Sequence, residues 1–158
     1  MSKKLRFGII GAGRIGPVHA ETLAYRAPQA EAVVIADINR AAAEKVAARY
    51  GIPKVVDSAD AVINDRNIDA IVLCTPTNTH TELIVQTAQA GKHIFCEKPV
   101  SHSLKKIDEA IAAVDAAGVK MQVGFNRRFD SNFMRVRRAI ESDEIGTPQL
   151  FHIVSRDP

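Results

Sequence analysis

Tryptophan is absent from this 158-residue sequence, cysteine occurs only twice, and there is no long apolar run. A membrane-spanning helix needs about 20 consecutive apolar residues, so none is expected. Residues 1–4 (Met-Ser-Lys-Lys) lack the apolar segment of a signal peptide. Cys74 and Cys96 form neither a CxxC pair nor a metal-ligand spacing, which predicts small buried thiols, a reducing compartment and no metal site. These absences predict a cytoplasmic protein without membrane contact.

A large excess of one charge is also missing. The chain has 21 Lys and Arg against 18 Asp and Glu, a net charge of +3. A nucleic-acid-binding protein gathers its basic residues into a patch or stripe, so nucleic acid is not an expected partner. The densest basic run is Arg127, Arg128, Arg135, Arg137 and Arg138. We interpret the last three as a solvated helix face and leave open whether the run also contacts an anion or a substrate domain.

Residues 11–16 (Gly-Ala-Gly-Arg-Ile-Gly) have the spacing GxGxxG directly after an apolar run over 5–10. In this pattern Gly11 permits a tight turn, Gly13 lets the backbone approach a pyrophosphate, and Gly16 lets a helix pack on the strand. The N-terminus of that helix then offers free N–H groups to phosphates. A glycine-rich turn alone is weak evidence, but the strand before it and the helical pattern after it predict a dinucleotide site.

A second predicted strand, residues 32–36, ends at Asp37, about 20 residues after Gly16. A carboxylate there accepts hydrogen bonds from the adenosine ribose and repels a 2′-phosphate, which favours NAD over NADP. Arg40 leaves a dual preference open. The alternative is that Asp37 only caps a turn before Asn39.

Helix and strand patterns alternate through the first 123 residues, and at 46% apolar content the chain can bury one good core. Strands are predicted over residues 5–10, 32–36, 54–56, 68–74, 93–96 and 120–123, and Asn39, Ser58 and Ser103 are predicted to cap helices between them. This alternation predicts an α/β fold, a doubly wound parallel Rossmann sheet ordered 3-2-1-4-5-6. We assign residues 1–124 to this dinucleotide-binding domain. Residues 125–158 are assigned to a crossover helix capped by Asp130 and a strand over 149–155, the beginning of a truncated second domain.

Ligands of open α/β sheets bind at the carboxyl ends of the strands, and three segments are predicted to lie there. In residues 74–80, hydroxyls, an amide and a helix N-terminus are available to a cofactor. Thr79 and Glu82 match a capping box. The alternative interpretation makes Thr79 only a helix cap and His80 a surface residue of the first turn.

Glu97-Lys98-Pro99 follows the fifth predicted strand, and residues 124–129 (Gly-Phe-Asn-Arg-Arg-Phe) follow the sixth. A lysine at a strand end beside a cofactor site can donate a charged hydrogen bond to a substrate hydroxyl or ketone. An ordinary surface Lys-Pro loop is the alternative for Lys98. The polar groups of 124–129 suit a polyol pocket, and packing at a domain junction competes with that interpretation.

Taken in order, these motifs carry a family resemblance: residues 11–16 with His19, Thr75-Pro76 with His80, Glu97-Lys98-Pro99, and residues 124–130. Together they resemble the glucose-fructose oxidoreductase/inositol dehydrogenase (Gfo/Idh/MocA) family over essentially the whole chain. Residues 126–130 and 155–158 are most similar to the inositol 2-dehydrogenases of that family. The Glu-Lys-Pro triplet makes the ordered set specific.

The resemblance implies NAD-linked oxidation of one ring hydroxyl of a cyclic polyol, myo-inositol to the 2-keto inosose, by a homo-oligomer. It implies that Lys98 orients and polarises that hydroxyl. Family members continue into a second domain that supplies an Asp and a His, the His acting as general base. None of His80, His93, His102 and His152 matches that motif, so this chain alone is expected to bind NAD and turn over little or no polyol.

The expected site residues follow from the motifs and the resemblance. Cofactor contacts are expected from Gly11, Ala12, Gly13, Arg14, Ile15, Gly16, Asp37, Ile38, Arg40, Thr75, Pro76, Asn78, His80, Glu97 and Lys98. Lys98 is the expected catalytic residue, and Lys98, Asn126 and Arg127 are expected to contact the substrate. Two alternatives stay open: a stand-alone NAD-binding or redox-sensing module, and a related sugar dehydrogenase that uses NAD or NADP.

Overall fold

A computed structural model of the chain describes residues 3–154 and residue 156, and it divides into two compact units, 1–124 and 125–158. Of the C-terminal residues named above, Ser155, Asp157 and Pro158 lie outside the described residues. Within the described part, no helix is both long and apolar enough to cross a membrane.

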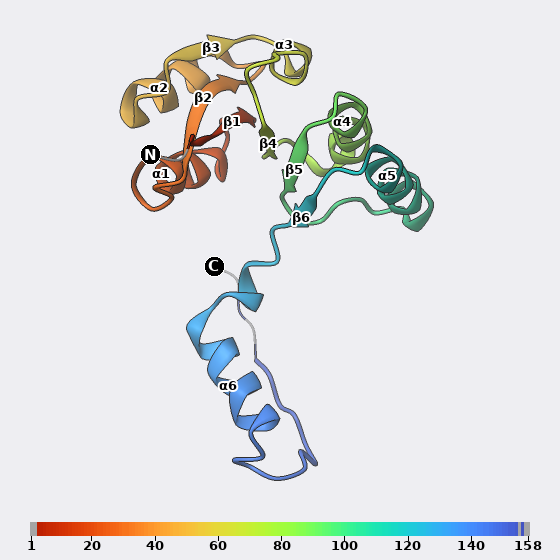
Figure 1. Ribbon diagram of the computed structural model, residues 1–158. Coiled ribbons are helices and arrows are strands. Elements are labelled where there is room, and N and C mark those ends of the chain that lie inside the picture. Colours follow the sequence, from red (N-terminus) through yellow and green to blue (C-terminus); the bar gives the residue numbers. More distant parts are fainter. Residues whose placement is uncertain (1–2, 155, 157–158) are drawn as a thin grey trace. The chain divides into compact units, whose positions relative to one another are not determined.

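The first unit is built on a six-stranded sheet (Figure 1). Its strands are β1 (Leu5–Ile10), β2 (Ala30–Ala36), β3 (Lys54–Val56), β4 (Ala70–Leu73), β5 (His93–Cys96) and β6 (Met121–Val123). Every neighbouring pair is parallel and the spatial order is β3-β2-β1-β4-β5-β6. The predicted doubly wound sheet and its strand order are therefore confirmed.

Helices cover both faces of this sheet. They are α1 (Gly16–Tyr25), α2 (Arg40–Tyr50), α3 (Ala59–Ile63), α4 (Thr77–Gln89) and α5 (Leu104–Ala117). Successive strand residues point to opposite faces. In β2, accordingly, Ile35 packs with α1 and α2, whereas Val34 and Ala36 belong to the core under α3, α4 and α5. Two buried faces explain why the central strands are continuous apolar runs.

Most helix starts follow the capping residues predicted from the sequence. The side-chain oxygens of Asn39, Ser58 and Ser103 accept hydrogen bonds from backbone N–H groups in the first turns of α2, α3 and α5. The exception is α4, for which the predicted capping box at Thr79 is wrong. This helix begins at Thr77 after an extended Pro76, and Thr79 Oγ1 lies 2.8 Å from the Pro76 carbonyl oxygen.

The second unit contains a 3-10 turn, η1 (Asn126–Arg128), and one helix, α6 (Ser131–Glu141). Asp130 caps α6 as predicted, because its Oδ1 accepts hydrogen bonds from the N–H groups of Asn132 and Phe133. The strand predicted over 149–155 is wrong: residues 149–154 belong to no helix or strand. A strand forms only against a hydrogen-bonded neighbour, and the described part of this unit offers none.

Candidate dinucleotide-binding site

The glycine loop follows β1 and leads into α1. Two of its glycines are required by the packing of the chain itself, and the third is not. Gly11 has a φ of +105°, and a Cβ there would lie 2.6 Å from the carbonyl carbon and oxygen of Cys74. A Cβ on Gly16 would collide with the Gly11 carbonyl oxygen. Both positions therefore need glycine for the chain's own packing.

Gly13 differs from its two neighbours in the motif. A Cβ added there would meet no described atom within 4 Å, and its φ is not positive. The protein's own structure thus gives no reason for glycine at this position. A ligand that approaches the backbone closely would supply the reason, as the diphosphate of a dinucleotide does in this motif.

The start of α1 adds one further amide to this loop. Residue 17 is proline, which has no N–H, and the Val18 N–H donates to the Ile15 carbonyl oxygen at 3.1 Å, so the Gly16 amide is the one left without a partner in the described part of this turn. The N-cap, Ile15, makes no side-chain capping bond, and the first turn carries no acidic residue within the described chain. The Gly16 amide and the positive end of the helix dipole favour an anion. The fit of this loop to a diphosphate therefore rests on room at Gly13 and on this amide.

Asp37, at the end of β2, is bound to two backbone amides. Its Oδ2 accepts a hydrogen bond from the N–H of Ala12 at 2.6 Å, and its Oδ1 accepts one from the N–H of Asn39 at 2.7 Å. The carboxylate therefore caps its own turn and also reaches into the glycine loop. A single charge fixed beside the loop is suited to accept hydrogen bonds from a ribose.

Arg40 and Ile38 flank this carboxylate differently. The guanidinium of Arg40 donates to Glu44 Oε1 and Asp57 Oδ1, both at 2.8 Å, and these two carboxylates, Glu44 first, raise the Arg40 pKa. Arg40 is thus engaged by acids of the chain itself. The side chain of Ile38 is fully exposed, which is the setting that a stacking contact with an adenine would need.

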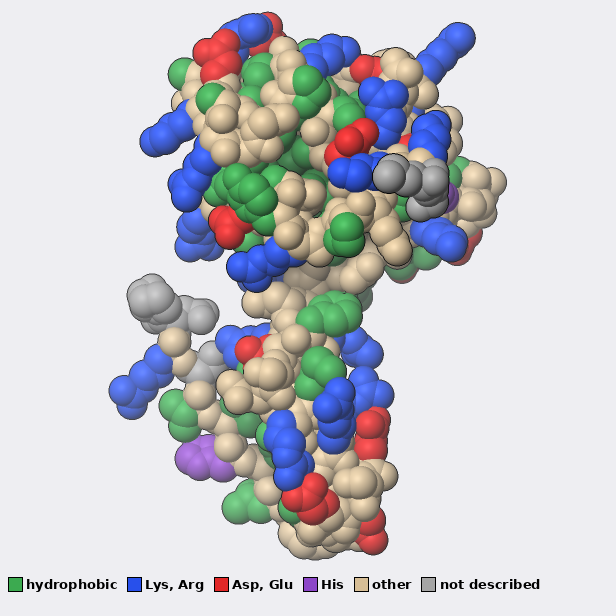
Figure 2. Space-filling model, turned by 60° about the vertical axis from the view of Figure 1, so that its left-hand side comes forward, with side chains coloured by type: hydrophobic (Ala, Val, Ile, Leu, Met, Phe, Trp, Pro, Cys, Tyr) green, Lys and Arg blue, Asp and Glu red, His purple; other side chains and the backbone are tan. Residues whose placement is uncertain are grey.

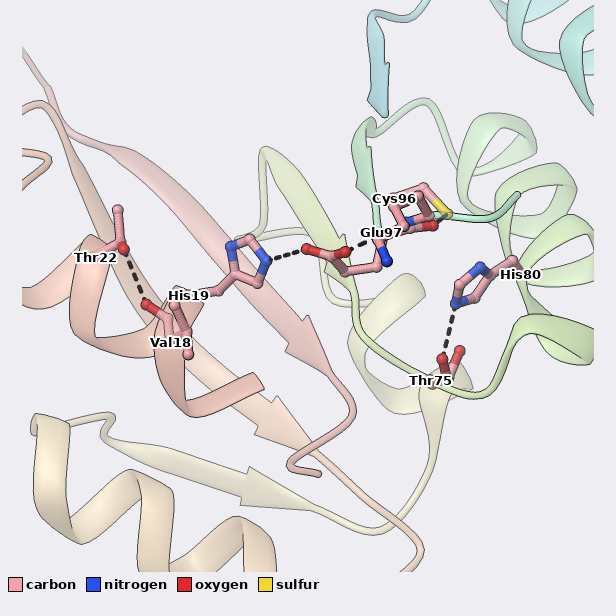
Figure 3. Close-up of polar contacts among 8 residues, drawn as sticks. Val18, His19, Thr22, Thr75, His80, Cys96 and Glu97 are labelled. Carbon is pink, nitrogen blue, oxygen red and sulfur yellow. Dashed lines mark hydrogen bonds and ion pairs between the residues drawn. The ribbon is translucent and has the colours of Figure 1, made fainter. Parts of the chain in front are cut away.

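His80 lies in the first turns of α4 and is 1% exposed, so the alternative interpretation of it as a surface residue is wrong. Its Nε2 lies 2.8 Å from the carbonyl oxygen of Thr75 (Figure 3). Its Nδ1 lies 2.9 Å from the carbonyl oxygen of Pro99. The imidazole therefore joins the loop after β4 to the loop after β5. A contact of His80 with the cofactor stays a prediction, and the structure favours an indirect role.

Glu97-Lys98-Pro99 continues β5 at the same edge of the sheet, and the Lys98–Pro99 peptide bond is cis. The Glu97 Oε1 accepts a hydrogen bond from His19 Nε2 at 2.8 Å (Figure 3). Lys98 is exposed, and within the described residues its ammonium has no hydrogen-bond or ion-pair partner. A free ammonium at a strand end can donate to a ligand oxygen.

The link between His19 and Glu97 was missed by the sequence analysis, which placed His19 only in the helix pattern and the family motif. The two residues are 78 positions apart. No periodicity or local motif relates positions so distant, so only the arrangement of α1 beside β5 reveals the contact.

The two cysteines follow neighbouring strand ends but lie in different cores, on opposite faces of the sheet. Burial is the main cause that raises their pKa values, that of Cys96 to about 12 and that of Cys74 further. Both thiols therefore stay protonated and unreactive. Within the described residues, no group of three or more His, Cys, Asp or Glu could hold a metal ion.

The predicted site residues divide between the two units. The first unit brings together the glycine loop, Asp37 and the ends of β4 and β5, with Arg14, Pro76 and Asn78 exposed around them. Asn126 and Arg127 belong to η1 in the second unit, where the Arg127 guanidinium lies over the Phe133 ring at 5.1 Å. On the face drawn in Figure 2, Lys and Arg side chains are spread around the first unit and not gathered on one element.

Comparison with known proteins adds relatives to this geometry. The chain is 46% identical over 158 residues to an uncharacterized oxidoreductase, YrbE, of Bacillus subtilis, and 47% identical over 154 residues to inositol 2-dehydrogenase of Rhizobium meliloti. The alignments cover 100% and 98% of this chain and 46% of each relative. The chain therefore spans about half the length of these relatives.

A solved structure extends the comparison to three dimensions. Scyllo-inositol dehydrogenase from Lactobacillus casei with bound NAD(H) and scyllo-inositol matches with a TM-score of 0.86 at 28% identity, over 91% of this chain and 43% of that one. Residues 5–125 match the GFO_IDH_MocA family, an oxidoreductase family with an NAD-binding Rossmann fold. Because the matched residues contain the whole six-stranded sheet, the family resemblance is confirmed: the chain belongs to the Gfo/Idh/MocA oxidoreductases, and residues 5–125 are their NAD-binding fold.

Proposed function

We propose that this chain is the cofactor-binding part of an NAD-dependent dehydrogenase that oxidises a ring hydroxyl of a cyclic polyol, with myo-inositol as substrate and a 2-keto inosose as product. The observation that carries the proposal is the exposed Lys98 at the end of β5, at the same sheet edge as the glycine loop. The named inositol dehydrogenases among the relatives support this substrate class.

The residues that would hold the cofactor are those whose own contacts leave room for it. The amides of the glycine loop and of the first turn of α1 would bind the diphosphate, and Asp37 would accept hydrogen bonds from the adenosine ribose. The fixed charge of Asp37 would repel a 2′-phosphate, which favours NAD over NADP. Bound NAD supplies the hydride acceptor for the reaction.

Lys98 would act on the substrate oxygen. As the hydroxyl is oxidised, its carbon loses a hydride and its oxygen loses a proton. An ammonium that donates a hydrogen bond to that oxygen stabilises the negative charge that develops on it. Asn126 and Arg127 are proposed as further substrate contacts. The family resemblance assigns the general base to a second domain, so no histidine of this chain is proposed for it.

The experiment is calorimetric titration of the 158-residue chain with NAD and with NADP, together with an absorbance assay for NADH formation from NAD and myo-inositol. We expect NAD to bind at least about tenfold more tightly than NADP, a difference of about 1.4 kcal/mol. We expect no measurable NADH from the chain alone. Failure to bind NAD would contradict the assignment, and turnover near an ordinary enzyme rate, about 10 per second, would contradict the need for a second domain.

A stand-alone NAD-binding module is a second candidate, because the first unit has a complete sheet with both faces covered by helices. The predicted strand over 149–155, as the beginning of a truncated second domain, would argue against such a module, but the described part of that segment is not a strand. A partner that associates only with the NAD-bound or only with the NADH-bound chain would favour the module. A sugar substrate with NADP, a homo-oligomer, a cytoplasmic location and the absence of nucleic-acid partners stay predictions.

A further inference from the structure

The turn that carries Lys98 is held from two sides by histidines of two different helices. From α4, His80 reaches the carbonyl oxygen of Pro99, directly after Lys98. From α1, His19 reaches the carboxylate of Glu97, directly before Lys98. Figure 3 shows the His19 and Glu97 side chains pointing toward one another from their two elements.

The contact between His19 and Glu97 is specific in its geometry. The Nε2 to Oε1 distance is 2.8 Å, and the two side chains are 20% and 16% exposed. The imidazole also packs edge-on against Phe95 of β5, with ring centroids 4.9 Å apart. Because a carboxylate can only accept, the imidazole donates its Nε2–H. A charged acceptor and partial shielding from water make this stronger than an ordinary surface hydrogen bond.

The other oxygen of the same carboxylate faces the backbone of the turn. Glu97 Oε2 accepts a hydrogen bond from the N–H of Lys98 at 3.3 Å. Residue 124, which has no side chain, gives the carboxylate its room: a Cβ on Gly124 would lie 3.1 Å from Glu97 Oε1 and 3.3 Å from Oε2. That separation would force the carboxylate to move by a few tenths of an ångström.

The direction in which a dinucleotide would cross the sheet relates the His19–Glu97 contact to the nicotinamide half of the cofactor. The glycine loop sits after β1, and Asp37, the adenosine side, sits after β2. In a sheet ordered β3-β2-β1-β4-β5-β6, a dinucleotide whose diphosphate lies at β1 must extend its other half over β4 and β5. The helix that would bind the diphosphate is therefore the helix that carries His19.

We propose that His19 is a positioning residue for the nicotinamide half of NAD, which holds the Lys98 turn in place through the carboxylate of Glu97. The proposal rests on the proposed function, because it needs a dinucleotide that lies across the strand ends. In the proposed function the glycine loop, Asp37 and Lys98 have roles and His19 has none. The proposal gives His19 a role. His19 itself need not touch the cofactor.

The test compares two ligands, NADH and ADP, by calorimetric titration of the 158-residue chain. ADP contains the adenosine and diphosphate but neither the second ribose nor the nicotinamide. For His19→Leu we expect NADH affinity to fall by as much as about tenfold, because binding must then also order the Lys98 turn that this hydrogen bond otherwise holds, and ADP affinity to change less than about twofold. For His19→Gln, whose amide can donate to Glu97, we expect most of the loss to be recovered.

Two further variants separate positioning from folding. Thr22→Val removes a hydroxyl of the same helix that donates only to the Val18 carbonyl oxygen, at 2.9 Å, and is expected to bind both ligands as the wild type does. Gly124→Ala displaces the Glu97 carboxylate without changing His19, and should lower NADH affinity selectively. If His19→Leu does not fold, Gly124→Ala and His19→Gln decide the question.

Each outcome has a defined meaning. Equal losses of NADH and ADP affinity, or unchanged NADH affinity in both His19→Leu and Gly124→Ala, would refute the positioning role while leaving the proposed function intact. Failure of His19→Gln to recover NADH affinity would refute the donor role of the imidazole. A wild-type chain that binds neither ligand would instead overturn the proposed function, and this inference with it.

Discussion

The two ends of the candidate site are held by different kinds of contact. The glycine-loop end, residues 11–16 with Asp37, is closed by backbone: Asp37 binds the amides of Ala12 and Asn39. The β5 end, residues 97–99, is held by side chains, those of His19 and His80, that come from other helices. The comparison teaches that the glycine-loop end is held through backbone amides of the turns after β1 and β2, and the β5 end through side chains of two helices.

The largest effect is expected from Gly11→Ala, at the glycine-loop end. A Cβ there would lie 2.6 Å from backbone atoms of Cys74, and the φ of +105° is one that alanine avoids. We expect the free energy of unfolding to fall by about 3 kcal/mol or more, and NAD binding to be lost. Chemical denaturation and calorimetry measure the two effects.

Gly13→Ala is the matched control for that prediction. No described atom lies within 4 Å of a Cβ at this position, so stability should change by less than about 0.5 kcal/mol. NAD affinity should nevertheless fall at least about tenfold, because the added methyl group occupies the space proposed for the diphosphate. Unchanged NAD affinity in Gly13→Ala would contradict the proposal that this loop binds the diphosphate.

The next largest effect is expected at the β5 end from His80→Leu. The substitution removes both contacts of a buried imidazole and leaves the carbonyl oxygens of Thr75 and Pro99 without these partners. We expect a loss of about 2 kcal/mol in the free energy of unfolding, measured by urea denaturation. The matched control is His93→Leu at the opposite end of β5, where an exposed imidazole accepts one hydrogen bond from the Lys120 N–H.

His93→Leu should cost less than about 1 kcal/mol, since water replaces an exposed partner. If His80→Leu were no more destabilising than His93→Leu, the two ends of the site would not differ as described. The β5 end would then not depend on His80.

A smaller effect on affinity is expected from Asp37→Ser. The substitution removes a carboxylate that would accept hydrogen bonds from the ribose and would repel a 2′-phosphate, so NAD affinity should fall about tenfold while NADP affinity rises. Titration with both cofactors measures the change in preference. Asp108→Ser, which removes an exposed acid from α5, is the control and should leave both affinities unchanged. Equal binding of NAD and NADP by the wild type would contradict the role given to Asp37.

The smallest effect is expected from Asp57→Asn, which removes one of the two carboxylates that bind the Arg40 guanidinium. The Arg40–Asp57 pair is exposed, and exposed ion pairs are weak, so overall stability should not change measurably. A less restrained guanidinium near Asp37 should raise NADP affinity, by less than about threefold. Competition titration of NADP against NAD would measure this shift, and an unchanged or lower NADP affinity would contradict the role given to Arg40.

The sequence predicted the glycine-loop end well because each of its parts is local. The strand, turn and helix around Gly11 and Gly16 are neighbours in the chain, and the distance from Gly16 to Asp37 is the length of one helix and one strand. The helix caps at Asn39, Ser58, Ser103 and Asp130 were predicted correctly for the same reason. Each needs only a side chain and an amide two or three residues away.

Two of the wrong predictions concern features that depend on partners elsewhere in the chain. Residues 149–154 have an alternating pattern but no described neighbour to pair with, so they are not a strand. His80 reads as a polar first-turn residue, yet it is buried because the loop after β5 passes over it and offers a carbonyl oxygen. In both cases the residue's surroundings, and not its type, decided the outcome.

The sequence by itself determined the doubly wound sheet, its strand order and the phosphate-binding turn, because apolar periodicity and the needs of glycine act over a few neighbouring residues. Only the tertiary structure decided that Asp37 closes on Ala12, that His19 holds Glu97, and that His80 joins the loops after β4 and β5. Hydrogen bonds between groups far apart in the chain form when packing brings both partners together, and no local pattern encodes that meeting.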